Sequence, residues 1–93
     1  MIRKELAVTN PEGLQARAAV MLVQTACKFE SRIRIEQGAK IINAKSMMGV
    51  LSLGVAQKGS IQLCVDGDDE QQALAALTQL ISSGFTEKPG KRS

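Results

Sequence analysis

Strand-like and helix-like apolar patterns follow one another along these 93 residues, and their order restricts the chain to very few folds. Alternation of apolar and polar residues predicts amphipathic strands over 2–8, 32–36, 40–43 and 60–66. Apolar residues recur at helical spacing over 16–27, over 46–53, and from Asp69 to about Gly84. The predicted order of elements is therefore β-α-β-β-α-β-α.

The polar residues of these strands fall on one face, which decides how the layers stack. An antiparallel sheet tolerates water on one face, so all three helices should pack against the other. The predicted fold class is α+β: an open-faced, two-layer β-sandwich with a four-stranded antiparallel sheet and three helices on one face. Because a chain of this length supports one compact core, we expect a single domain over 1–85 and a flexible basic tail over 86–93.

Local signals mark the helices. Ser46 is placed to cap the second helix and Gly54 to close it. Asp69 and Gln72 have the spacing of a capping box at the start of the last helix, with aspartate in the place of serine or threonine. The first helix should bury a row of apolar residues: Ala16, Ala19, Val20, Val23, Ala26 and Cys27. The last helix should bury Leu74, Leu77, Leu80 and Ile81.

The net charge of +3 gives little support to a nucleic-acid function. Two of those charges lie in the last ten residues, where Gly and Pro favour a solvated end. Only two aromatic residues are present, Phe29 and Phe85, which is too few for a base-stacking platform. The N-terminus alternates and no apolar run is long enough for a membrane helix, so we expect a cytoplasmic protein with reduced cysteines.

The cysteines and acidic residues do not have the spacing of a metal site. Cys27 continues the apolar row of the first helix and is expected in the core. Cys64 alternates onto the polar face of the sheet, where we expect a surface thiol with nothing nearby to activate it. The acidic residues within 66–70 are explained as caps and as complements of a helix dipole. We therefore expect no metal and no cofactor.

The first candidate site lies at the start of the first helix, over Gly13-Leu14-Gln15-Ala16-Arg17. Unpaired backbone N–H groups and the positive end of the helix dipole favour an anion at such a position. A cation in the first turn is unfavourable for the helix, so Arg17 suits an arginine kept for phosphate or carboxylate. A solvated arginine is the alternative explanation.

Ser46 begins the second candidate site. It is either a plain N-cap or a phosphorylation site, and the two roles are compatible because a phosphoserine there gains from the dipole and the free N–H groups. The helix that follows carries more apolar residues than one face can hold: Met47, Met48, Val50, Leu51 and Leu53. Either some of them form an exposed, adaptable partner surface, or the sheet envelops the helix.

The chain contains no histidine. Imidazole is the usual carrier of a labile phosphoryl group and the usual general base near neutral pH. The amide nitrogen of Gln15 has its lone pair delocalised into the carbonyl, so it cannot take up phosphate. A Ser–His or Cys–His pair cannot form either, and we expect no enzyme activity.

The two candidate sites resemble the two motifs of the HPr family of the bacterial sugar phosphotransferase system, and the resemblance covers about residues 2 to 85. That family reads Gly-Leu/Ile-His-Ala-Arg-Pro-Ala where this chain has Gln15 and Ala18 in the histidine and proline positions. It reads Lys-Ser, an apolar residue, then Met-Gly where this chain has residues 45–49, and residues 22–26 also match a familiar stretch. Alanine in place of proline continues a helix comfortably and does not threaten the fold.

Glutamine at the histidine position marks the catabolite-repression branch of this family. The resemblance implies an HPr-like fold, no phosphorelay from phosphoenolpyruvate, and modification of Ser46 by HPr kinase/phosphorylase. The phosphoserine form would then bind the carbon catabolite control protein CcpA, a LacI-type repressor, as its corepressor, without itself contacting nucleic acid or membrane. By position, the partner surface would comprise Gln15, Arg17, Val20, Met47, Met48 and Leu51. Of these, Val20 also fits the buried row of the first helix.

Two other functions and two oligomeric states fit the residues. A small acylphosphatase-like enzyme would hold phosphate at the first candidate site, although that loop lacks the other residues expected there. A nucleic-acid-binding module would use Arg3, Arg32 and Arg34 on the open sheet face, where Glu5 and Glu36 dilute the charge. The first strand is predicted at an edge of the sheet, so the protein is either a monomer or a weak, strand-exchanged homodimer.

Overall fold

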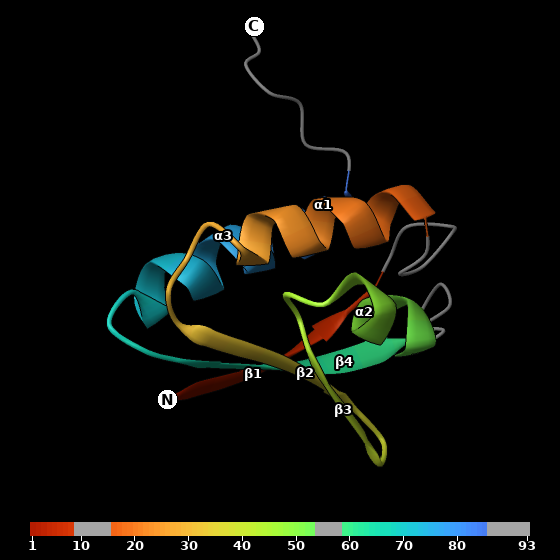
Figure 1. The fold of residues 1–93 in the computed structure, drawn as a ribbon, viewed down its shortest axis with the longest axis horizontal. Helices are drawn as coiled ribbons and strands as arrows, with labels where there is room; N and C mark the ends of the chain where they lie inside the picture. Colours follow the sequence, from red (N-terminus) through yellow and green to blue (C-terminus); the bar gives the residue numbers. More distant parts are fainter. Residues whose placement is uncertain (9–15, 54–58, 86–93) are drawn as a thin grey trace, which may run out of the picture.

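The computed structural model describes residues 1–8, 16–53 and 59–85 (Figure 1). The elements follow the predicted order: β1 Ile2–Ala7, α1 Ala16–Ala26, β2 Arg32–Gln37, β3 Lys40–Asn43, α2 Met47–Leu53, β4 Ser60–Asp66 and α3 Glu70–Ser82. Three features predicted from the sequence lie outside the described residues: positions 13–15 of the first candidate site, which include Gln15, then Gly54, and the tail 86–93. The division into a domain and a tail therefore stays a prediction.

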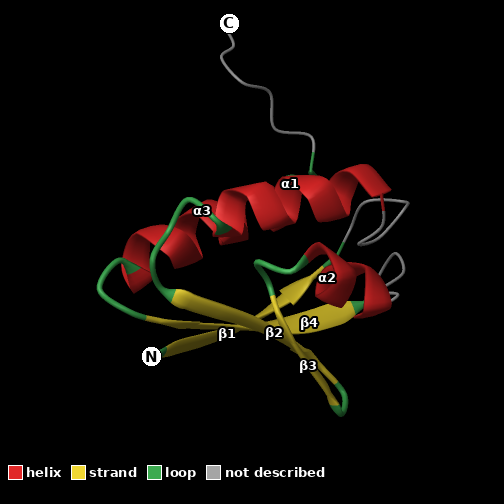
Figure 2. Ribbon diagram, viewed as in Figure 1, coloured by secondary structure: helices red, strands yellow, loops and turns green. Residues whose placement is uncertain are grey.

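The strands form one antiparallel sheet in the order β1-β4-β2-β3. The first strand lies at an edge, as predicted, and β3 forms the other edge. Figure 2 shows the three helices, in red, on one side of the strands, in yellow. The predicted α+β, open-faced sandwich is confirmed, and the face of the sheet opposite the helices is called the open face below.

The core lies between the sheet and the helices. Alternation puts the apolar residues of β2 and β4 on the same face, where Ile33 stands opposite Val65 and Ile35 opposite Leu63. All four side chains are buried, as are Leu77, Leu80 and Ile81 of α3. Burying one such side chain contributes about 1.5–3 kcal/mol, so this shared core holds the sheet and the helices together.

The first helix is rotated relative to the prediction. Its buried residues are Ala18, Ala19, Leu22 and Ala26, whereas Val20 is 41% exposed. Residues two apart on a helix lie about 200° apart around its axis, so turning the large Leu22 into the core turns Val20 out of it. The expectation that Cys27 is a core residue is wrong, because α1 ends at Ala26 and Cys27 is exposed in the turn that follows.

The start of α3 also differs from the expected capping box. The side chain of Asp69 makes no cap hydrogen bond. Its carboxylate instead accepts hydrogen bonds from the backbone N–H groups of Glu30 (2.9 Å) and Ser31 (3.0 Å) and from the Ser31 hydroxyl. The hydrogen bond at the start of α3 is made by the neighbouring Glu70, whose Oε1 accepts from the N–H of Gly67 at 3.1 Å. Asp69 therefore fastens the segment that leads into β2.

The end of α3 near Gly84 is confirmed and has a specific geometry. Gly84 has a φ of 70°, a left-handed conformation that suits glycine. The N–H of Gly84 donates to the carbonyl of Ile81, and the N–H of Phe85 donates to the carbonyl of Leu80. These two bonds form a Schellman motif, and the chain then places the buried ring of Phe85 against the core.

The role of Asp69 gives a pH-dependent prediction. Hydrogen bonds from the Ser31 hydroxyl and the Glu30 amide hold the pKa of Asp69 below its ordinary value of 3.8. Because the folded state has the lower pKa, this stabilisation is complete above about pH 4 and is lost as the pH falls through the folded-state pKa. Asp69→Asn should lower Tm by about 5 °C at pH 7, and the difference from wild type should shrink toward pH 2.

Thermal unfolding followed by circular dichroism at pH 7 and at acid pH measures this effect. Glu5→Gln is the matched control, because Glu5 is an exposed acid on β1 and makes no hydrogen bond or ion pair within the described part of the chain. It should unfold like wild type at both pH values. A deficit of Asp69→Asn that stays constant across this range would contradict the assignment.

Candidate functional site

Ser46 lies at the junction of β3 and α2. Its Oγ accepts a hydrogen bond from the N–H of Gly49 at 3.1 Å, which confirms the predicted N-cap. The backbone before it forms a tight turn, in which Asn43 accepts from Ser46 N–H through its carbonyl (3.0 Å) and from Lys45 N–H through its side chain (2.9 Å). The end of the β3 strand therefore fixes where the hydroxyl stands.

Two further residues hold this turn in place. The Lys45 ammonium donates to the carbonyl of Phe29 at 2.7 Å, which ties the turn to the segment between α1 and β2. Gly49 leaves room where the helix meets the sheet, because an added Cβ would lie 3.3 Å from the Cβ of Ile42 and 3.4 Å from the Ser46 Oγ. The Ser46 hydroxyl is therefore held in position by the hydrogen bonds of this turn and by its close contact with Gly49.

The short helix α2 divides its apolar residues between core and solvent. Val50 and Leu53 are buried, and Met47 is half-buried against the core. Met48 is 81% exposed and Leu51 42% exposed. The expectation that some of these residues are exposed is therefore confirmed for Met48 and Leu51, and the alternative that the sheet envelops α2 is wrong.

The helix α1 contributes the other predicted surface residues that the structure describes. Arg17 is exposed in its first turn, and Val20 is exposed one turn later. α1 contacts α2, and Figure 1 shows the start of α1 on the same side of the molecule as α2. Neither helix has an acidic residue in its first turn. Within the described ranges, these helix starts therefore present a cation and a hydroxyl without a nearby helical carboxylate.

The open face of the sheet carries polar side chains, as predicted, but they are partly paired. One Nη atom of Arg3 donates to Glu36 at 2.8 Å and to Gln62 at 2.9 Å. This cation is therefore neutralised, which weakens the nucleic-acid alternative beyond the dilution by glutamates already expected.

Cys64 is not the surface thiol that the alternation suggested. It does lie on the open face, between Arg3 of β1 and Arg34 of β2, but only 1% of it is exposed. Its thiol donates to Glu36 at 3.4 Å. Burial first, and then the bond to the Glu36 carboxylate, raise the pKa of Cys64, which disfavours the nucleophilic thiolate form. Alternation assigns a face, but it does not reveal whether long neighbours cover a small residue.

Two kinds of feature do not occur in residues 1–8, 16–53 and 59–85: a cluster of metal-ligating side chains and a membrane-spanning helix. Within these ranges, no group of three or more His, Cys, Asp or Glu side chains is placed to hold a metal ion. None of the helices described is both long enough and apolar enough to cross a bilayer.

Comparison with known proteins gives a consistent relationship over nearly the whole chain. The family described as the PTS HPr component phosphorylation site matches residues 2–83. The phosphocarrier protein HPr of Xylella fastidiosa strain Temecula1 is 44% identical over 87 residues, which are 94% of this chain and 98% of that protein.

Two solved structures extend this relationship to the fold. HPr-C-His from Thermoanaerobacter tengcongensis matches with a TM-score of 0.91 and 46% identity, over 96% of this chain and all of that one. Crh, the catabolite repression protein of Bacillus subtilis, matches with a TM-score of 0.73 and 37% identity, over 94% of this chain and all of that one. The Crh crystal structure is described as a dimer with a swapped domain.

Proposed function

Because this chain belongs to the HPr family of the phosphotransferase system, we propose that it is a regulator that displays a phosphate on Ser46 and does not carry one on histidine. HPr proteins are non-enzymatic carriers, and this chain is not an enzyme. Its proposed task is that of the catabolite-repression branch: a corepressor whose phosphorylated form binds the LacI-type regulator CcpA.

The loss of the histidine relay follows from the sequence. The chain has no histidine at any position, and glutamine occupies the position of the family's phosphate carrier. An amide cannot accept a phosphoryl group as an imidazole nitrogen does. Incubation with phosphoenolpyruvate and the relay's phosphoryl donors should therefore leave the mass of this protein unchanged.

The observation that carries the proposal is the position of the Ser46 hydroxyl. It caps α2 through Gly49 N–H, and the exposed Met48 and Leu51 follow it on the same short helix. A phosphate on this oxygen would keep a hydrogen bond to that N–H group and add the helix dipole. One modification would thus place a dianion beside exposed apolar side chains, a combination suited to a regulated protein surface.

The proposed partners are HPr kinase/phosphorylase and CcpA. The surface of this chain that binds them would include Arg17 and Val20 of α1 and Met47, Met48 and Leu51 of α2. By sequence position it would also include Gln15. The dianion would meet an arginine-lined site on the repressor, where a bidentate contact is stronger than a neutral hydrogen bond. Strand exchange at the β1 edge remains a proposed route to a dimer, supported by the swapped dimer described for Crh.

Phosphorylation by the cognate kinase tests this function. Incubation with HPr kinase/phosphorylase and ATP should place one phosphate on Ser46, located by mass spectrometry of peptides. Ser46→Ala should remain unmodified, and it should stay folded despite losing a cap that contributes about 1 kcal/mol. Ser52→Ala is the matched control, because Ser52 is exposed on the same helix and its hydroxyl donates to the Gly49 carbonyl. Phosphate elsewhere than on Ser46, or no phosphate, contradicts the proposal.

A further inference from the structure

Two arginines of β2, Arg32 and Arg34, lie two residues apart on the open face, where Asp66 of β4 stands opposite Arg32 in the sheet. Both are exposed, and neither makes a hydrogen bond or an ion pair within the part of the chain that the structure describes. Alternate residues of a strand lie about 7 Å apart on one face, so one small ligand can reach both guanidinium groups. Two unpaired like charges at this spacing favour an anion between them.

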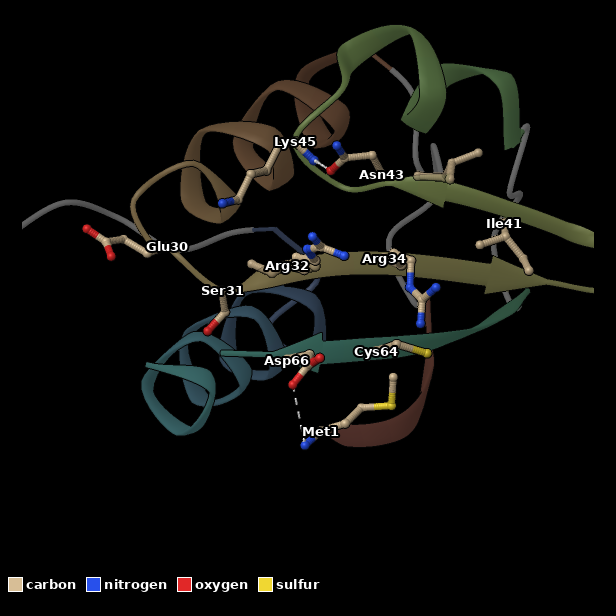
Figure 3. Close-up of a pocket in the computed structure, with 12 residues that line it drawn as sticks. Met1, Glu30, Ser31, Arg32, Arg34, Ile41, Asn43, Lys45, Cys64 and Asp66 are labelled. Atoms are coloured by element: carbon tan, nitrogen blue, oxygen red, sulfur yellow. Dashed lines mark hydrogen bonds and ion pairs between the residues drawn. The ribbon is translucent and has the colours of Figure 1, made fainter. Parts of the chain in front are cut away.

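A hollow of about 460 Å³ opens beside these arginines (Figure 3). Ile41 and Asn43 of β3 line one side of it, and Cys64 of β4 and Met1 line the other. This volume falls within the range of roughly 300–1,000 Å³ typical of small-molecule sites. Ile41 and Met1 are 59% and 61% exposed, so apolar surface lies close to the cationic groups.

The other charged groups around the hollow form no ion pair with the two arginines within the described residues. Asp66 stands opposite Arg32 in the sheet, and its carboxylate lies 3.7 Å from the N-terminal ammonium of Met1, which lies 3.3 Å from Glu70. Figure 3 shows the Glu30 carboxylate pointing away from both guanidinium groups. Glu36, the next residue along this face, is paired with Arg3 at 2.8 Å. A third cation, Lys45, is committed to the Phe29 carbonyl. The positive charge of the hollow is thus concentrated on Arg32 and Arg34.

We propose that this hollow binds a small molecule that carries a phosphate group and an apolar part. Arg32 and Arg34 hold the phosphate, for which the planar guanidinium fork is the best-suited side chain. The apolar part lies against Ile41 and Met1. The site uses neither Ser46 nor the exposed residues of α1 and α2, so it is independent of the proposed regulatory function.

The test is a titration of the ¹⁵N-labelled protein with phenyl phosphate, which combines the two required chemistries. Saturable shifts in the millimolar range are expected for backbone amides of β2 and β3 around the hollow. The double variant Arg32→Gln/Arg34→Gln should weaken binding at least tenfold, and Ile41→Ser should weaken it several-fold. Lys28→Gln, which removes an exposed cation elsewhere, should bind like wild type.

Three outcomes overturn this proposal. The first is the absence of saturable shifts around the hollow. The second is unchanged binding by the double arginine variant, whose fold is verified by its Tm. The third is binding of a single-stranded oligonucleotide through the same arginines without binding of phenyl phosphate, which would favour a nucleic-acid surface. Failure of Ser46 phosphorylation has no bearing on these measurements.

Discussion

Replacing Gly67 by alanine should destabilise the fold by about 3 kcal/mol or more, a large part of the 5–15 kcal/mol that stabilises a typical domain. Gly67 connects β4 to α3 and passes directly over Ser31. A Cβ added here would lie 2.6 Å from the Cα and 2.8 Å from the Cβ of Ser31. Ser31 is 2% exposed, and Asp69 fixes its amide and hydroxyl. Neither backbone can therefore move aside cheaply.

Urea unfolding followed by circular dichroism measures this loss, with Gly38→Ala as the matched control. Gly38 has a φ of 60°, but nothing lies within 4 Å of an added Cβ. Its replacement should cost only the strain of a left-handed alanine, about 1–2 kcal/mol. Equal destabilisation by the two variants would show that the close approach to Ser31 is not the dominant effect at Gly67.

Phosphorylation of Ser46 should strengthen binding to CcpA, the proposed partner, about 100-fold, which corresponds to ~2.7 kcal/mol. That gain matches a few charge-assisted hydrogen bonds from the partner to the phosphate dianion on Ser46. Ser46→Ala should bind no better than the unmodified protein, because it cannot acquire the charge. Isothermal titration calorimetry with CcpA, comparing the two forms of the wild-type chain, measures the difference.

The apolar surround of Ser46 should account for much of the remaining affinity. Met48→Lys buries a charge where an apolar side chain is proposed to dock, so the phosphorylated variant should bind at least tenfold more weakly. Ile41→Lys is the matched control, because Ile41 is also exposed but lies on β3, on the open face. If the phosphorylated Met48→Lys variant binds CcpA as tightly as the phosphorylated wild type, the partner surface lies elsewhere.

The strands were predictable because a period of two assigns each residue to a face without further information. The predicted 60–66 segment matches β4 at both ends, and the buried Ile61, Leu63 and Val65 alternate as expected. The rotation of α1 was not predictable in the same way. Alanines and other apolar residues occur on several sides of that helix, so more than one of its faces could have been the buried one. The large side chain of Leu22 decided which face packs against the core.

The errors at Asp69 and Cys64 have a different physical origin. Asp69 accepts hydrogen bonds from Glu30 and Ser31, which precede it by 39 and 38 positions in the sequence. A pattern of neighbouring residues cannot reveal such contacts. The burial of Cys64 likewise depends on strands β1 and β2. The Ser46 cap was predictable because it is local: the hydroxyl and its N–H donor are three residues apart. Gln15, the most informative residue in the sequence, lies outside the described residues.

The two edges of the sheet have a consequence for how the protein behaves at high concentration. Edge strand β1 exposes Arg3, Lys4 and Glu5 in succession, and edge strand β3 is only four residues long and begins with Lys40. Charged and short edges discourage the sheets of separate molecules from pairing edge to edge and extending into fibrils. A cell could therefore accumulate this small chain while its aggregation stays suppressed.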